Sequence, residues 1–193
     1  DPDPNVREKH NAKPPQNFHR KKPLKHWQMN ELYHYMTKRR KPNLNYWEHL
    51  NASKIKEYVG DDIWNSYKKI SIVRNPWDHA VSWFKWQEKY GYEGTKNGEF
   101  ERYLINNYRS TLPFYTTNYG LYDIDFMIKF ENISQDIKKL STSLNIKEDF
   151  NLPNTKSNIR SKENYRDYYI KESMIDIVYD KAFSTIKKFN YRF

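Results

Sequence analysis

The feature that most constrains the fold is a short β-branched run that leads directly into a helix start. Residues 69–73 have the sequence Lys-Ile-Ser-Ile-Val, which is typical of a buried strand. Asn75 then provides a good N-cap, and Pro76 suits the first helical position, where a backbone N–H would lack a partner. We therefore predict a strand over 69–73 and a helix from 76 to about 90.

Further patterns along the chain predict an alternation of helices and strands. We expect a second strand over 126–130, polar loops over 1–25 and 151–163, and helices over 26–39, 52–59, 99–107, 133–144 and 168–188. Asn51 or Ser53 would cap the helix at 52–59, and Gly60 would close it. Such alternation indicates an α/β fold, a parallel β-sheet flanked by helices. We predict one domain over 26–193, preceded by an extended basic arm over 1–25.

The first strand-to-helix junction has the chemistry of a phosphate site. Ligands of α/β sheets bind beyond the carboxyl ends of strands, where Arg74 places a guanidinium. The helix start should offer free backbone N–H donors, and Ser82, about two turns on, can add a hydroxyl. Asp78 is expected to bond back to the N–H of the capping residue. Helical spacing predicts that the helix packs on the sheet through Trp77, Ala80, Val81 and Phe84.

An alternative interpretation, in which the same residues bind no ligand, is also open. Arg74 could simply pair with a carboxylate, and Ser82 could be a serine on the helix surface. The complete string between Ser71 and Ser82 favours the phosphate site. It resembles the 3'-phosphate-binding motif of sulfotransferases, which runs Arg-Asn-Pro-aromatic-Asp, three further residues and then Ser. The family commonly has Arg where this chain has His79.

The resemblance implies a function and a set of ligand contacts. These enzymes use the donor 3'-phosphoadenosine 5'-phosphosulfate, and Arg74 and Ser82 would hold its 3'-phosphate. Segments similar to the later parts of the family lie at 130–132, 152–157, 165–169 and 189–191. The similarity covers about residues 45–193, is closest to the carbohydrate and bacterial or phage-type branch, and implies a P-loop NTPase-like sulfotransferase fold. It makes Lys156 and Ser157 candidate donor contacts, with a solvated polar loop as the alternative.

One expected part of a sulfotransferase is not found in the sequence. The family's 5'-phosphosulfate loop, Lys-x-Gly-Thr/Ser after the first strand, has no counterpart here. Residues 94–96 (Gly-Thr-Lys) contain the same residue types as that loop, but no predicted strand precedes them, so we interpret them as a turn. Either the first strand and loop lie upstream of a fragment, as the missing initial Met suggests, or the chain is a relative that binds but does not catalyse. We favour the fragment.

Sulfuryl transfer to a hydroxyl also needs a base for the acceptor's proton, and His is suited to this near neutral pH. His49 has a position similar to the base histidine of some glycan sulfotransferases, and Glu48 is the second candidate. A structural histidine that caps or packs against the helix at 52–59 is the alternative. The expected acceptor is a hydroxyl group, most naturally of a glycan, and no metal is expected.

Composition leaves a different class of function to consider. The net charge of +10, together with 6 Trp, 17 Tyr and 10 Phe, would also suit a basic nucleic-acid-binding module. No known nucleic-acid-reading motif is present, so we expect no nucleic-acid partner. The absence of cysteine excludes disulfides and thiolate zinc sites. Without a signal peptide or an apolar run of about 20 residues, a cytoplasmic location is expected, with a Golgi-lumenal or secreted fragment as the alternative.

Overall fold

A computed structural model of the chain describes residues 19–21, 24, 27–38, 43–45, 49–95, 99–117, 122–147 and 164–193. The chain divides into two compact units, Asp1–Ser66 and Tyr67–Phe193, so the domain predicted over 26–193 extends across both. The predicted loop over 151–163 and most of the predicted arm lie outside the described residues. The fold is mixed α/β, as the alternating pattern indicates.

The first unit contains two short paired strands and three helices among its described residues. Strand β1 (His19–Lys21) pairs antiparallel with β2 (Asn43–Asn45). The helices are α2 (Met29–Lys38), α3 (Ala52–Val59) and α4 (Asp61–Ser66). Helix α3 has the predicted bounds.

The two ends of helix α3 follow from its flanking residues. The side chain of Asn51 accepts a hydrogen bond from the backbone N–H of Lys54 at 2.8 Å, so Asn51 is the cap. Gly60 closes the helix with a positive φ of 85°, which glycine adopts without steric cost.

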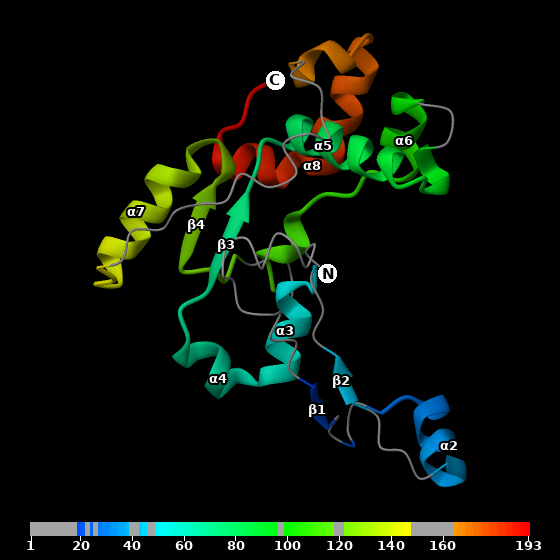
Figure 1. The fold of residues 1–193 in the computed structure, drawn as a ribbon, viewed down its shortest axis with the longest axis vertical. Coiled ribbons are helices and arrows are strands. Elements are labelled where there is room, and N and C mark those ends of the chain that lie inside the picture. The colour runs from blue at the N-terminus through cyan, green and yellow to red at the C-terminus, as the bar shows by residue number, and fades with distance from the viewer. Residues whose placement is uncertain are drawn as a thin grey trace. The chain divides into compact units, whose positions relative to one another are not determined.

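The second unit is built on two parallel strands, as predicted. Strand β3 (Ile70–Val73) pairs with β4 (Phe126–Lys129), with Ile70 opposite Phe126 and Val73 opposite Lys129. The two arrows run side by side in Figure 1, and α7 (Ile133–Ser143) packs along β4. Because the register is direct, the residues that follow the two strands emerge at the same edge of the sheet.

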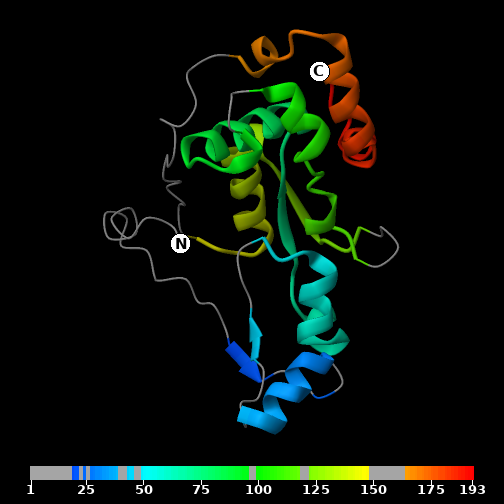
Figure 2. The same cartoon turned by 90° about the vertical axis from the view of Figure 1, so that its right-hand side faces the viewer.

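Helix α5 (Pro76–Lys89) starts where the sequence predicts, but it packs differently. The four apolar residues expected to face the sheet are buried against helices α6 (Phe100–Asn106) and α8 (Glu172–Phe189), which lie beside α5 in Figures 1 and 2. They are Trp77, Ala80, Val81 and Phe84. The prediction that they pack onto the sheet is therefore wrong. The described sheet has only two strands, whereas the neighbouring helices and loops offer large aromatic side chains, including Phe100, Tyr103, Tyr108 and Tyr169.

The remaining predicted elements are found with small shifts at their ends. Helices α6 and α7 confirm the helices predicted over 99–107 and 133–144. The last helix, α8, begins later than predicted, and Tyr165–Tyr168 forms a short 3-10 helix before it. No helix of the described residues is long and apolar enough to cross a membrane.

Candidate functional site

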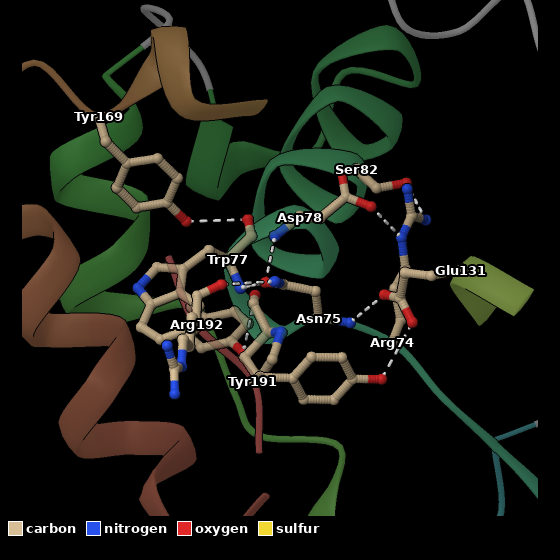
Figure 3. A network of polar contacts seen from close by, with 11 residues as sticks. Arg74, Asn75, Trp77, Asp78, Ser82, Glu131, Tyr169, Tyr191 and Arg192 are labelled. Carbon is tan, nitrogen blue, oxygen red and sulfur yellow. Dashed lines mark hydrogen bonds and ion pairs between the residues drawn. The ribbon is translucent and has the colours of Figure 1, made fainter. Parts of the chain in front are cut away.

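Arg74, the first residue after β3, contacts two side chains of helix α5. Its Nε donates to Asp78 Oδ2 at 2.6 Å, and its Nη1 donates to Ser82 Oγ at 3.0 Å (Figure 3). The acceptors lie four and eight residues further along the chain, about one and two helical turns on. The side chain of Arg74 is 21 % exposed. The structure thus brings together the two residues that the sequence assigns to phosphate binding.

Phe130 supports the guanidinium from the neighbouring strand. Because Val73 lies opposite Lys129, the next residues, Arg74 and Phe130, follow the two strands at equivalent positions. The guanidinium carbon lies 4.2 Å from the centroid of the Phe130 ring, a cation–π contact. Together with the bond to Asp78, this contact restricts the orientation of the guanidinium.

The arrangement leaves several donors of Arg74 available to a ligand. An arginine has five N–H donors, and the contacts to Asp78 and Ser82 use two of them; the described residues provide no further acceptor. The Ser82 hydroxyl accepts from Arg74 and can still donate its own proton. Within the described contacts, three N–H groups and one O–H therefore remain unused, which suits the three terminal oxygens of a phosphomonoester.

The contacts of Arg74 contain features of both interpretations given above, the phosphate site and the simple ion pair with a carboxylate. Its ion pair with Asp78, whose side chain is 16 % exposed, is the carboxylate contact of the alternative interpretation. Ser82, however, is no isolated surface serine, because its hydroxyl touches the same guanidinium. Since Asp78 offsets the charge of Arg74, binding of an anion here depends on the geometry of the donors more than on net charge.

The backbone donors at the start of α5 are already satisfied, which corrects two expectations. Asn75 Oδ1 accepts from the backbone N–H groups of Trp77 at 3.0 Å and Asp78 at 3.4 Å. The N–H of Asn75 donates to Glu131 Oε1 at 2.5 Å. Two predictions are therefore wrong: that the helix start offers free backbone N–H donors, and that Asp78 bonds to the N–H of the capping residue. The Asn75 side chain caps the helix, and Glu131 takes the N–H that Asp78 was expected to reach.

A second carboxylate, that of Glu131, links the junction to the last residues of the chain. Glu131 Oε2 accepts from the hydroxyl of Tyr191 at 3.1 Å, and Asn75 Nδ2 donates to the carbonyl oxygen of Arg192 at 3.1 Å (Figure 3). The phenol of Tyr191 has its pKa raised by burial and by the neighbouring Glu131. It therefore remains a protonated donor at neutral pH.

Burial of aromatic side chains fixes the first turn of α5 from its other side. The hydroxyl of Tyr169 donates to the carbonyl oxygen of Trp77 at 2.9 Å, and burial raises the pKa of Tyr169. Phe193 packs edge-on against the rings of Trp77, at 5.7 Å, and Tyr169, at 5.1 Å. The residues around Asn75 are consequently held by the segment after β4, by the segment before α8 and by the end of the chain.

The other predicted site residues are not joined to this site by the described contacts. His49 is exposed, has a left-handed φ of 70° and belongs to the first unit, whereas Arg74 belongs to the second. Glu48, Lys156 and Ser157 lie outside the described residues. The roles of these four residues stay predictions. His79 packs its ring near those of Trp83, at 6.5 Å, and Tyr108, at 6.1 Å.

Sequence reasoning missed Asp78, Phe130 and Glu131 as neighbours of Arg74, and Tyr191 as a partner of Glu131. One signal could have found two of them. Phe130 and Glu131 follow β4 just as Arg74 and Asn75 follow β3, and parallel strands place such residues at one edge. The carboxylate of Asp78 falls one turn after Arg74, at the helical spacing of ion pairs. Tyr191 had no comparable signal.

No group of three or more His, Asp or Glu side chains that could hold a metal ion occurs in the described part of the chain. The chain matches no protein-family model, and it has no significant match among curated proteins or solved structures.

Proposed function

We propose that this protein is a sulfotransferase that uses 3'-phosphoadenosine 5'-phosphosulfate and transfers its sulfuryl group to a hydroxyl, most naturally of a carbohydrate. The observation that carries the proposal is the 3.0 Å contact between Arg74 Nη1 and Ser82 Oγ at the carboxyl end of a parallel strand. In the motif that this segment resembles, these two residue types bind the 3'-phosphate of the donor. Within the mixed α/β class, we propose that the chain has the P-loop-like fold of that family.

The donors that the described residues leave unused suit a phosphomonoester better than a diester. A 3'-phosphate presents three terminal oxygens, and Arg74 and Ser82 together offer three N–H groups and one O–H. A phosphodiester has only two such oxygens and an extra substituent. This match supports a 3'-phosphorylated nucleotide rather than a nucleic-acid backbone as the ligand.

The proposed reaction needs positioning more than covalent catalysis. The acceptor oxygen attacks sulfur, the bond between sulfur and the bridging oxygen of the 5'-phosphate breaks, and 3'-phosphoadenosine 5'-phosphate leaves. A base, His49 or Glu48, accepts the hydroxyl proton. Arg74 and Ser82 would anchor the nucleotide far from the reacting atoms, so that binding energy orients the sulfuryl group. Lys156 and Ser157 are proposed as further donor contacts.

A ligand panel tests the proposal against its alternatives. Thermal unfolding of the protein is followed with 3'-phosphoadenosine 5'-phosphate, 5'-AMP and a single-stranded oligonucleotide at low and high salt. We expect stabilisation by the first ligand that greatly exceeds that by 5'-AMP. Equal response to the two nucleotides, with oligonucleotide binding that falls steeply with salt, would instead indicate a nucleic-acid-binding module.

Transfer of labelled sulfate from the donor to a glycan acceptor then separates an enzyme from a relative that only binds. Loss of transfer in His49→Ala would identify His49 as the base. If transfer is retained in that variant but lost in Glu48→Gln, the base is Glu48. Selective binding of the 3'-phosphorylated nucleotide without transfer by the full-length protein would identify a non-catalytic relative.

A further inference from the structure

Glu131 presents a second carboxylate at the junction that holds Arg74. It follows Phe130, on whose ring the guanidinium stacks. Both of its oxygens are engaged: Oε1 accepts from the N–H of Asn75 at 2.5 Å, and Oε2 accepts from the hydroxyl of Tyr191 at 3.1 Å. Figure 3 shows the carboxylate between these two donors. Among the described contacts, the ion pair of Arg74 is with Asp78 and not with Glu131.

A carboxylate released at this place would compete with a phosphate. The outer edge of a guanidinium binds carboxylates and phosphates in the same bidentate geometry. Asp78 already occupies the Nε side, so a second carboxylate would be drawn to the remaining donors of Arg74. It would also repel a dianionic ligand. The position of Glu131 therefore matters for any anion that binds to Arg74.

We propose that Tyr191 is a positioning residue that keeps the Glu131 carboxylate away from the phosphate-binding edge of Arg74. The inference rests on the proposed function, because it concerns the same 3'-phosphate site. Tyr191 would act through Glu131 and need not touch the ligand itself.

Tyr191 is itself held by several contacts. Lys129 Nζ lies 5.3 Å from the centroid of its ring and donates to the carbonyl oxygen of Phe189 at 3.0 Å. The next residue, Arg192, accepts a hydrogen bond from Asn75 Nδ2 through its carbonyl oxygen. The hydroxyl is consequently presented to Glu131 from a backbone that is itself held by hydrogen bonds.

A double-mutant cycle tests the inference. Calorimetry measures the affinity of the full chain for 3'-phosphoadenosine 5'-phosphate and for 5'-AMP in wild type, Tyr191→Phe, Glu131→Gln and the double variant. Tyr191→Phe should weaken binding of the 3'-phosphorylated ligand about fivefold and leave 5'-AMP unchanged. The double variant should regain wild-type affinity, since an amide can neither neutralise Arg74 nor repel the phosphate. A merely structural role of Tyr191 would not give this rescue.

The controls separate this inference from the function on which it rests. Tyr122→Phe removes another hydroxyl with one hydrogen bond, to the carbonyl oxygen of Ser184, and should leave both affinities unchanged. If wild type prefers the 3'-phosphorylated ligand but Tyr191→Phe binds it equally well, or the double variant stays weak, the positioning role is wrong. If wild type shows no preference, the proposed function is wrong and the inference falls with it. Thermal unfolding of each variant checks that it is folded.

Discussion

The hydroxyl of Ser82 lies 3.0 Å from Nη1 of Arg74, although eight residues separate the two along the chain. The contact is possible because α5 begins directly after β3, so that the arginine at the strand end turns back along the first two turns of the helix. The spacing that makes the sequence resemble a nucleotide-binding motif is therefore a geometric requirement. A shorter or longer connection between β3 and α5 would separate the two side chains.

Ser82→Ala should weaken binding of 3'-phosphoadenosine 5'-phosphate without unfolding the protein. The variant loses the hydroxyl that donates to the phosphate, and a hydrogen bond to a charged group contributes about 1.5 kcal/mol or more, so affinity should fall about tenfold. Calorimetry measures the loss. Ser143→Ala, which removes an exposed hydroxyl from α7, is the matched control. Equal affinity of Ser82→Ala and wild type would remove Ser82 from the site.

Asn75→Ala should destabilise the protein, because the side chain caps α5 and also donates to the carbonyl oxygen of Arg192. Loss of an N-cap costs about 1 kcal/mol, and the loss of the second bond should add to it. Asn75→Asp keeps the capping acceptor and should lose less. Urea unfolding measures both variants, and equal stability of Asn75→Ala and wild type would contradict the capping role.

Two aspartates should make the stability of the protein depend on pH in acid. The side-chain and backbone N–H groups of Lys69 lower the pKa of Asp125 below 3.8, and the backbone N–H of Lys129, with Lys139, does the same for Asp136. Between the ordinary pKa and the lowered one, the unfolded state binds more protons than the folded state. The stabilisation from these two carboxylates is therefore complete well above the ordinary pKa, and it is lost as the pH falls from that value through the lowered pKa of the folded state.

Thermal unfolding between pH 7 and about pH 2.5, a range that includes the ordinary pKa of an aspartate, checks this expectation. The double variant Asp125→Asn, Asp136→Asn should have a lower midpoint at pH 7 and a flatter decline in acid than wild type. Asp176→Asn, at an exposed position on α8, controls for the loss of a carboxylate. An unchanged decline in the double variant would contradict the role assigned to the two residues.

The local structure around the site could be predicted because each step depends on neighbours in sequence. The β-branched run at 70–73, the cap at Asn75 and the proline at 76 specify the strand, the turn and the helix start, and the structure has all three. The closeness of Arg74 and Ser82 follows from the direct passage from β3 into α5 together with the helical spacing of α5.

The partners of these elements could not be predicted in the same way. Helical periodicity shows that Trp77 and Phe84 are buried, but not whether a sheet or other helices cover them. The position of Glu131 depends on the register between two strands that are more than fifty residues apart. The contact of Tyr191 depends on where the chain runs after α8. Such long-range choices are decided by packing of the whole unit rather than by local preference.

Calorimetry with 3'-phosphoadenosine 5'-phosphate and 5'-AMP, on wild type and Arg74→Ala, tests the central claim most directly. Arg102→Ala, which removes an exposed guanidinium on α6, controls for the loss of positive charge. We expect wild type and Arg102→Ala to prefer the 3'-phosphorylated ligand strongly, and a folded Arg74→Ala to bind both ligands equally weakly. Equal affinity of wild type for the two ligands, or a preference that survives in Arg74→Ala, would contradict the assignment of Arg74 to the 3'-phosphate.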